Sequence, residues 1–471
     1  MTPTRWAWLL LSIAAAAAPF FVVDIPPCAD LPQHAAQARL FFETLGAGDT
    51  PYRIQWLTPY GLSYVPLLLL WLVLPPLAAA KLHLLVIALG CTAAIHALAA
   101  HKGRPPEAAA LASLFVFSLP LYWGFLSFLV GFPAFVLWIV VVERERRRDA
   151  LVVLGAALLL YLCHALWFLA GAAYLGVRML VARRLRVEWP RIVALLPILA
   201  LGVWQSGRFA SDRFATRPFW DDWPLTRLAG FVDAALGGLR DPIEIVVVVA
   251  AAAWILVGLA RRRDLDRDLA LAGGLFVVFF AVLPMKYLNT VSFAQRWLPF
   301  ALALLVLAVP APPGRAALRN LAVAALVVAF SAITTASWRA FQRIDLDGLE
   351  EALAALPDRP RVLGLDYVQH RNQRFKPRVT LQTFAYAQVL HGGRVSFSFA
   401  EHPASLVVYD KPFRPPWTDG LEWWPTRFQP SDVQYFDFVL VSDDHTMHDV
   451  FAGALRAVTH EGRWRLYAVP R

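Results

Sequence analysis

Apolar blocks of about 20 residues, separated by short basic clusters, fill the first 340 residues of this 471-residue chain. A helix of about 20 apolar residues is long enough to cross the hydrocarbon core of a bilayer. The blocks predict a polytopic α-helical membrane protein with about eleven transmembrane helices. Its expected spans are residues 6–23, 82–100, 107–122, 126–142, two within 150–181, 191–206, 243–260, 268–284, 297–311 and 316–336.

The composition changes near residue 340. Only 17% of the whole chain is charged, against about a quarter in an average soluble domain, and this depletion lies in residues 1–340. Residues 341–471 have an ordinary globular mixture. The sequence therefore predicts a transmembrane domain over 1–340 and a soluble α/β domain over 341–471, with an outer loop over 24–80.

Short apolar segments in the tail favour an α/β fold. Buried strands are expected at Arg361–Tyr367, Phe436–Ser442 and Trp464–Val469. Helices are expected at Thr380–Leu390 and Met447–Val458.

The basic clusters predict the orientation of the helices, because positive charge is retained on the cytoplasmic side. Residues 60–79 are interrupted by three prolines. All basic clusters lie on one side of the membrane if this block does not cross the bilayer but dips into it and returns, or lies along its interface. The N-terminus is then cytoplasmic and the tail extracytoplasmic. The first block also resembles a signal peptide, but its length favours an uncleaved span. The clusters are His101–Arg104, Arg144–Arg148, Arg183–Arg191, Arg261–Arg267 and Arg315–Arg319.

The net charge of +10 does not indicate nucleic-acid binding. The arginines lie between apolar blocks rather than in a basic stripe with exposed aromatic residues. Three cysteines form no paired framework. Usage rich in Ala, Leu and Arg indicates a GC-rich bacterium, which predicts the inner membrane with a periplasmic tail.

The first candidate site is DIPPCADLPQH, directly after the first span. A carboxylate at a membrane interface can act as a general base when its pKa is raised by partial desolvation. Asp30 and His34 lie one helical turn apart and share a face, with Asp24 as a reserve. Alternatively, Asp30 only caps the helix that begins near Pro32.

His164, in YLCHALWF, is expected at the outer turn of the 150–181 hairpin. An ionisable residue in such a block is a functional candidate. The alternative is a histidine bonded to a neighbouring backbone carbonyl.

Cations at an outer boundary suit a phosphate. Candidate phosphate ligands are Lys286, Tyr287, Gln295 and Arg296, with Arg53 in the first outer loop. The alternative is interfacial anchoring. A second group with the same two interpretations contains Arg208, Arg213, Arg217, Phe219, Trp220, Asp221, Asp222 and Trp223.

The segment DDHTMHD, Asp443–Asp449, has two histidines three residues apart with flanking carboxylates. Such a group offers a divalent-metal site; the favoured interpretation is a helix cap at Asp443 or Asp444 with solvent-facing histidines. No metal ligand set and no cofactor is expected. Trp423 and Trp424 offer either a stacking surface for a sugar or a docking contact.

The whole arrangement resembles the GT-C superfamily of membrane glycosyltransferases, which includes protein O-mannosyltransferases and lipid A aminoarabinose transferases. The similar features are the first span, DLPQH with its helix, SYVPLLLLWLVLPP, KLHLLVIALGCTAAIHALAAHKGR, the 150–181 hairpin and QRWLPFALALL. The resemblance covers nearly the whole chain, as architecture more than as motif.

This resemblance implies an inverting glycosyltransferase whose donor is a sugar on a polyprenyl phosphate. Its acceptor is a glycan, lipid or protein. Asp30 would be the catalytic acidic residue, and Arg296 would face the lipid phosphate. One feature departs from the family: the turn after the third span, YWGFLSFLVGFP, lacks the second acidic residue that many members carry.

Two other functions are compatible with the sequence. One is a transporter or flippase, although the chain has no visible inverted repeat. The other is a catalytically inactive relative that binds lipid, which the missing second carboxylate favours.

Overall fold

The computed structural model describes residues 2–46, 50–143, 150–183, 185–208, 217–221, 225–261, 264–287 and 290–470, with no side-chain description for 185–188. The chain divides into two compact units. The first comprises Met1–Pro19, Leu85–Leu121 and Phe125–Thr334, and the second comprises Phe20–Leu84, Tyr122–Gly124 and Thr335–Arg471. The second unit therefore combines most of the expected outer loop with the C-terminal residues.

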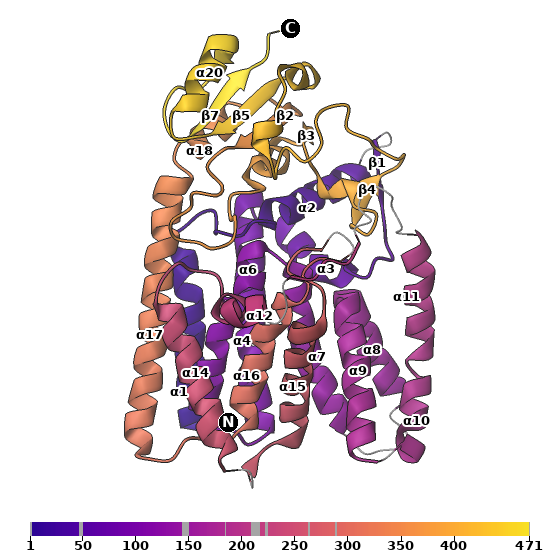
Figure 1. Ribbon diagram of the computed structural model, residues 1–471. Helices are drawn as coiled ribbons and strands as arrows, with labels where there is room; N and C mark the ends of the chain where they lie inside the picture. Colours follow the sequence, from indigo (N-terminus) through magenta and orange to yellow (C-terminus); the bar gives the residue numbers. More distant parts are fainter. Residues whose placement is uncertain are drawn as a thin grey trace. The chain divides into compact units, whose positions relative to one another are not determined.

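The first unit is built from helices that run roughly side by side (Figure 1). The α-helices α4 and α17 begin in one unit and end in the other. In chain order the helices of this part are α1 (Pro3–Ala17), α4 (Pro76–His101), α5 (Pro106–Ser113), α6 (Leu119–Trp123), α7 (Leu126–Glu143), α8 (Ala150–Cys163), α9 (Ala165–Val181), α10 (Leu185–Val193), α11 (Leu196–Arg208), α12 (Leu225–Ala229), α13 (Phe231–Ala235), α14 (Ile243–Leu259), α15 (Arg267–Val282), α16 (Leu298–Ala308) and α17 (Ala316–Ala340). Short 3₁₀ helices are η1 (Ala18–Phe21), η2 (Leu114–Val116) and η4 (Gln295–Trp297).

Every segment expected as a span contains a helix. Six helices of the described chain are long and apolar enough to cross a membrane, and five shorter ones are apolar. The chain is therefore mostly helical, with the several apolar helices of a multi-pass membrane protein. The number of crossings stays a prediction.

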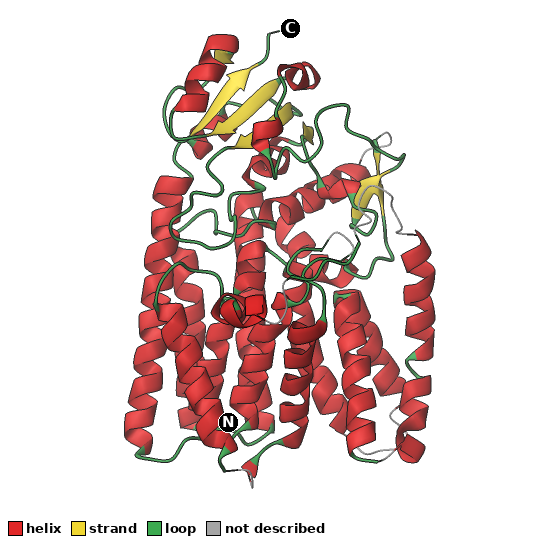
Figure 2. Ribbon diagram, in the orientation of Figure 1, coloured by secondary structure: helices red, strands yellow, loops and turns green. Residues whose placement is uncertain are grey.

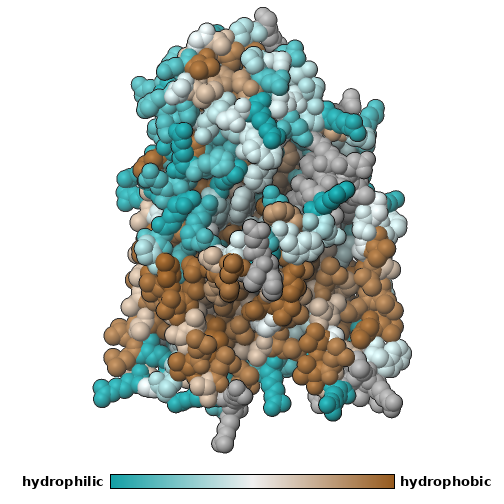
Figure 3. Space-filling view, in the orientation of Figure 1, coloured by the Kyte–Doolittle hydropathy of each residue, from teal (hydrophilic) through white to brown (hydrophobic). Residues whose placement is uncertain are grey.

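Aromatic side chains fill the interior of the first unit. The Trp167 ring lies 5.0 Å from Phe128 and 5.2 Å from Trp297. Helix α7 approaches α9 closely at Gly131, where a Cβ atom would lie 2.0 Å from the Trp167 ring. Around this core, hydrophobic side chains gather on the outer surface of the long helices, as Figure 3 shows.

Basic clusters meet carboxylates at one end of the first unit. Lys102 forms ion pairs with Glu143, Asp266 and Asp268. Four of the five predicted clusters contribute residues to this end, through Lys102–Asp266, Arg104–Asp266, Arg191–Val142 O and Arg319–Glu107. The fifth cluster, Arg144–Arg148, lies outside the described residues. These contacts place the described clusters at one end of the unit, and the side of the membrane on which that end lies stays a prediction.

The second unit contains a five-stranded sheet with the strand order β3-β2-β5-β7-β6. Figure 2 shows these strands as arrows beside short helices. β2 (Arg361–Asp366) is parallel to β3 (Arg394–Val395) and β5 (Phe438–Ser442), whereas β7 (Trp464–Ala468) is antiparallel to β5 and to β6 (Arg456–Ala457). The three predicted strands are present within one or two residues at either end. The remaining helices of the tail are η5, a π-helix (Phe341–Asp345), α18 (Leu349–Ala354), η6 (Thr383–Ala385), α19 (Tyr386–His391), η7 (Phe399–Glu401), η8 (Pro425–Arg427), η9 (Pro430–Tyr435) and α20 (Thr446–Ala454).

Residues of the expected outer loop are hydrogen-bonded to the tail. β1 (Tyr52–Ile54) pairs antiparallel with β4 (Val407–Tyr409). Helix α2 (Leu31–Gly46) presents Gln37, whose amide accepts a hydrogen bond from Val407 N–H at 2.7 Å and donates one to Val407 O at 3.1 Å. Because Gln37 and Val407 are fully buried, these amide bonds replace the water that the backbone loses.

Helix α3 (Gly61–Trp71) covers only part of the 60–79 block. The last residues of that block belong to α4, which begins at Pro76. One face of α3 packs through Tyr64 and Leu67 into a core that contains Leu40 and Phe41 of α2. On the other face, Leu69 is 61% exposed. A short helix with one buried and one exposed apolar face fits an interfacial position, which stays a prediction.

Candidate functional site

Asp30 lies directly before α2, and its position is fixed by two backbone hydrogen bonds and by the close approach of Gly124. Its N–H donates to Trp123 O at 3.1 Å, and the N–H of Ala29 donates to Tyr122 O at 2.9 Å. Gly124 has φ +84°, and a Cβ atom there would lie 2.7 Å from Asp30 N. The turn that lacks a second carboxylate therefore holds the Asp30 backbone with its carbonyls and a glycine. The Asp30 side chain itself is half-buried.

His34 lies one turn further along α2 and is 9% exposed. One ring nitrogen, Nε2, lies 3.2 Å from Gly124 O, and the other, Nδ1, lies 2.8 Å from the Tyr64 hydroxyl. A carbonyl oxygen only accepts, so Nε2 carries the proton and Nδ1 accepts from Tyr64. Both nitrogens are thereby occupied. We call Asp30, His34, Tyr64 and Gly124 the Asp30 cluster.

Burial lowers the pKa of His34 to about 4, despite a smaller opposing effect from its bond to Gly124. The ring is therefore neutral at ordinary pH, which fits the deduced tautomer. A neutral ring with both nitrogens bonded suits a residue that positions the Gly124 turn against Asp30. The catalytic role of His34 stays a prediction. This geometry favours a positioning role over direct contact with the reacting atoms.

The other acidic and basic candidates of the outer loop have different partners. Asp24 has an 84% exposed side chain, 3.6 Å from Lys81 Nζ. Its N–H donates to the Gln342 side chain at 3.1 Å. Arg53 is exposed on β1, opposite Val408.

Arg296 lies in η4 and is 2% exposed. Its guanidinium carbon lies 4.1 Å from the centre of the Phe125 ring and 5.2 Å from that of Phe128. Two of its N–H groups donate to the carbonyls of Val291, at 2.8 Å, and Ser292, at 3.3 Å. A buried guanidinium held against aromatic faces keeps its charge and a fixed orientation.

His164 lies between α8 and α9, at the turn where the sequence places it. Its Nδ1 accepts a hydrogen bond from Leu166 N–H at 3.1 Å, so the ring caps α9. This partner is a backbone N–H, and the backbone carbonyl of the alternative interpretation stays a prediction for the other ring nitrogen. His164 also interacts electrostatically with Arg296, and its ring lies 5.6 Å from that of Phe128. We call His164, Arg296, Phe125 and Phe128 the Arg296 cluster.

Lys286 and Tyr287 lie in a short extended segment before η4. The backbone of Lys286 forms an isolated antiparallel β-bridge with that of Phe219, and Tyr287 forms another with Thr290. Both side chains are exposed, Tyr287 by 37%. Gln295 is half-buried beside Arg296 in η4. Lys286, Tyr287 and Gln295 are therefore more exposed than Arg296.

The second arginine-rich group is described only in part. Arg208 lies 4.3 Å above the Trp204 ring, and Trp220 donates to Val282 O at 3.0 Å. Asp221 forms an ion pair with Arg227 at 2.8 Å. Arg227 is buried and was not among the residues predicted from the sequence. Arg213, Asp222 and Trp223 lie outside the described residues.

The Asp443–Asp449 segment caps a helix. Asp443 Oδ2 accepts from Met447 N–H at 2.8 Å, as the favoured interpretation predicts. His448 is 1% exposed, so the expectation that both histidines face solvent is wrong for this one. Its Nδ1 lies 3.1 Å from the Tyr467 hydroxyl, and its Nε2 faces the carbonyls of Asp443 and Arg463. No group of three or more potential ligands in the described part of the chain is arranged to hold a metal ion.

The tryptophans of the tail face different surroundings. Trp423 lies 6.0 Å from Trp123, measured between ring centres, and Arg378 lies over its ring. Trp424 is 48% exposed, and the guanidinium carbon of Arg427 lies 4.4 Å from the centre of its ring. The contact of Trp423 resembles docking, whereas Trp424 leaves an aromatic surface open.

Sequence reasoning missed Gly124 and Tyr64, which fix the environment of Asp30. A glycine between Trp123 and Phe125, in an otherwise apolar turn, was the available signal for a close backbone approach. Gln33 and Gln37, one turn apart on an apolar helix, were the signal for buried polar partners. Gln33 donates to Phe397 O at 2.9 Å and accepts from Phe399 N–H at 3.0 Å.

No protein-family model matches the chain, and no curated protein matches it. Among solved structures, it is similar to the arabinofuranosyltransferase AftD from mycobacteria, with 17% sequence identity and a TM-score of 0.49. The similarity covers 99% of this chain and 40% of that chain, so this chain spans less than half the length of AftD.

Proposed function

We propose that this chain is a membrane glycosyltransferase. It moves a sugar from a polyprenyl-phosphate donor to an acceptor on the extracytoplasmic face of the bacterial inner membrane. In this proposal about eleven helices cross the membrane, the N-terminus is cytoplasmic and the C-terminal domain is periplasmic. The observation that carries the proposal is the fixed, half-buried Asp30 at the start of α2, supported by buried, neutral His34.

Asp30 acts as the general base in this proposal. The acceptor hydroxyl attacks the anomeric carbon while its proton passes to the Asp30 carboxylate. The new carbon–oxygen bond forms on the face opposite the leaving group, so the configuration inverts. The bond from the anomeric carbon to the phosphate oxygen breaks, and its electron pair leaves with the polyprenyl phosphate. The backbone contacts of Ala29 and Asp30 provide the fixed geometry that such a base requires.

Arg296 stabilises the charge that develops on the leaving phosphate. A buried guanidinium acts in a low dielectric, where charge stabilisation is strongest. We assign supporting contacts with the donor lipid to Lys286, Tyr287, Gln295, His164 and Arg53, and the reserve base to Asp24. The acceptor is a glycan, lipid or protein. None of these steps uses a metal or a cofactor.

The proposal is tested by reconstituting the purified chain with radiolabelled polyprenyl-phosphate sugars and measuring transfer. Asp30→Asn should lower the rate about 10²-fold to 10⁴-fold, the usual contribution of a general base. Asp358→Asn, at an exposed position of the tail, is the matched control. Full transfer by Asp30→Asn would remove Asp30 from the mechanism, and loss in Asp24→Asn instead would assign the base to Asp24.

Arg296 is tested in the same assay with two substitutions. Arg296→Ala should lower the rate, and Arg296→Lys should restore only part of it, because lysine keeps the charge but loses the planar fork. Equal activity of both variants and wild type would exclude Arg296 from phosphate stabilisation. Binding of donor lipid without transfer, for every sugar tried, would favour the inactive relative, since the Asp30 turn carries no second carboxylate.

A further inference from the structure

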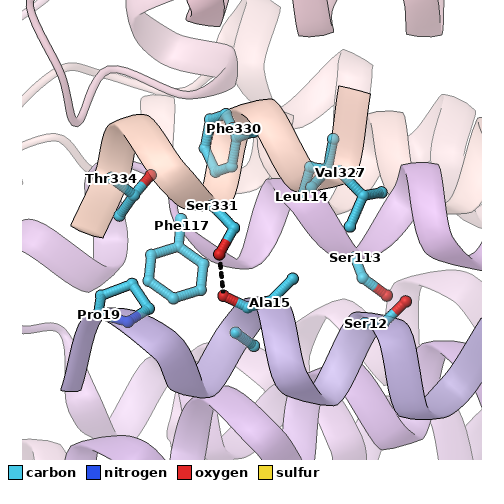
Figure 4. Close-up of a pocket in the computed structure, with 11 residues that line it drawn as sticks. Ser12, Ala15, Pro19, Ser113, Leu114, Phe117, Val327, Phe330, Ser331 and Thr334 are labelled. Carbon is cyan, nitrogen blue, oxygen red and sulfur yellow. Dashed lines mark hydrogen bonds between the residues drawn. The ribbon is translucent and has the colours of Figure 1, made fainter. Parts of the chain in front are cut away.

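A pocket lies among three helices of the first unit, and its lining includes no residue of the Asp30 cluster or the Arg296 cluster. Figure 4 shows its lining from α1 with η1, from α5 with η2, and from α17. Its empty volume is about 300 Å³ when the open space at its mouth is included, so it is a partly open groove rather than an enclosed cavity. The lining residues are Ser12, Ala15, Ala16, Pro19, Ser113, Leu114, Phe117, Val327, Phe330, Ser331 and Thr334.

The pocket follows the helices lengthwise. The residues from α1 and η1 have the spacing i, i+3, i+4, i+7, beginning at Ser12, and those from α17 have the same spacing, beginning at Val327. Such a stripe extends over about 10 Å of helix. The Ser331 hydroxyl donates to Ala15 O at 2.8 Å and so ties the two stripes together in parallel. This shape suits an extended hydrocarbon segment.

The two long helices beside the pocket lie at the periphery of the unit. Only 17% of the most apolar window of α17 is buried, and 28% of that of α1, against 89% for the helix over Pro106–Trp123. In the membrane topology of the proposed function, on which this step rests, α1 and α17 therefore face lipid. A bilayer lipid can reach a pocket between them.

Four hydroxyl groups line the pocket, and three have protein partners. Ser12 bonds with His96 Nε2 at 3.0 Å, Ser113 donates to Ala109 O at 2.7 Å, and Ser331 donates to Ala15 O. The fourth, Thr334 Oγ1, is buried without a partner, on a residue only 1% exposed. A buried hydroxyl without a partner costs free energy unless a ligand satisfies it.

Thr334 and Pro19 lie at the same end of the pocket (Figure 4). Pro19 is two residues from the end of η1, where the proposed first span reaches the outer interface. A hydrogen-bond acceptor on a lipid chain is expected at this depth, where the ester carbonyls of glycerophospholipids lie. The rest of the lining, with Val327 and Leu114, is apolar and suits the chain below the ester.

We propose that this pocket binds one acyl chain of a membrane glycerophospholipid, whose ester carbonyl accepts a hydrogen bond from Thr334. An isoprenoid chain has no acceptor to offer at this position, so the pocket is distinct from the proposed donor site. A lipid bound here packs its acyl chain between α1 and α17.

The test compares two lipids on the purified full chain in detergent by native mass spectrometry. The first is a diacyl phosphatidylethanolamine, and the second is its dialkyl ether analogue, which lacks the ester carbonyls. Wild type should retain the ester lipid about threefold more tightly, the effect of one hydrogen bond within a membrane. Thr334→Val should lose this preference, and Thr335→Val, the same change one residue on, should keep it.

The shape of the pocket is tested separately. Ala16→Leu fills it and should weaken binding of both lipids, whereas Ala14→Leu, at an exposed position of α1, should not. Equal retention of the two lipids by wild type, or equal effects of the two threonine variants, would overturn the proposal. Displacement of the ester lipid by polyprenyl phosphate, with loss of that binding in Ala16→Leu, would also overturn it and identify an isoprenoid occupant.

Lipid retention and sugar transfer are independent measurements. Asp30→Asn should leave the ester preference unchanged while it lowers transfer. If no donor supports transfer but the ester preference depends on Thr334, the pocket stands and the proposed enzyme fails. If transfer depends on Asp30 but the preference is absent, the reverse holds.

Discussion

The two units of this chain are stabilised by different means. In the first, large aromatic side chains share the packing; Trp167, for example, contacts Phe128, Phe276 and Trp297. In the second, residues of the predicted outer loop are joined to the tail through a few buried amides, above all Gln33 and Gln37.

This difference predicts where single substitutions matter. Apolar packing spreads its stabilisation over many contacts and tolerates exchanges that keep the volume. A buried amide that bonds both groups of a backbone residue cannot be replaced without leaving those groups unsatisfied. We therefore expect the second unit to respond sharply at a few positions, and the first unit to respond weakly at comparable ones.

The largest effect is expected at Gly124. Alanine there would force a Cβ atom to within 2.7 Å of Asp30 N, at φ +84°. The Asp30 segment must then move, and a displacement of about 1 Å at a reacting group costs about 100-fold in rate. Gly124→Ala should therefore lower sugar transfer at least about 100-fold, measured with the reconstituted chain.

Gly103 provides the control for backbone strain in the first unit. It also has a positive φ, +65°, but a Cβ atom there meets nothing within 4 Å. Gly103→Ala should cost about 1 kcal/mol of stability from strain alone and leave transfer nearly unchanged. Similar losses of transfer in the two variants would show that strain, not the contact with Asp30, explains the effect.

A smaller effect, on stability, is expected at Gln37. Gln37→Leu leaves the buried N–H and C=O of Val407 without their partners. Each orphaned group costs about 1–3 kcal/mol, so the second unit should lose about 3 kcal/mol. Limited proteolysis of the detergent-solubilised chain, with cleavage followed in the 341–471 tail, measures this loss.

Thr92 in α4 is the matched position of the first unit. It is fully buried and donates to Ala88 O at 2.9 Å, within its own helix. Because that bond is local, Thr92→Val should change stability by no more than about 0.5 kcal/mol. An effect as large as that of Gln37→Leu would break the comparison between the two units.

The sequence predicted the helices of the first unit well, because each apolar block carries its own length signal. It also predicted β2, β5 and β7, whose apolar residues form short continuous runs. It missed β1, β4, β3 and β6, which have two or three residues each. Such strands exist only through their partners, as Tyr52–Ile54 pairs with Val407–Tyr409, and pairing at a separation of some 350 residues leaves no local pattern.

The candidate site was predictable to the level of single residues but not of their contacts. Asp30 and His34 were expected on one face because helical spacing alone requires it. That His34 bonds Tyr64 and Gly124, and so has both nitrogens occupied, depends on three segments that meet only in the fold. Arg296 was expected at a boundary, but its burial against Phe125 and Phe128 was not.

The smallest effect concerns the pH dependence of stability through His34. Its pKa falls from 6.5 to about 4 on folding, chiefly because burial disfavours the charged ring. Between these values the unfolded chain binds the proton and the folded chain does not. The stabilisation is therefore complete above pH 6.5 and is lost as the pH falls towards 4. From pH 6.5 to about pH 4.5 the loss amounts to about 2 kcal/mol.

His34→Gln isolates this contribution, because its amide can still donate to Gly124 O but does not titrate. The unfolding temperature of wild type should fall on acidification from pH 6.5 to about pH 4.5, and that of the variant should fall less. Other groups act equally in both proteins, among them Asp366, whose pKa burial raises to about 6, with an effect of opposite sign. Parallel curves for the two proteins would mean that His34 takes up its proton without opening the Asp30 cluster. The second unit would then be less dependent on single buried groups than Gln37 and Gly124 indicate.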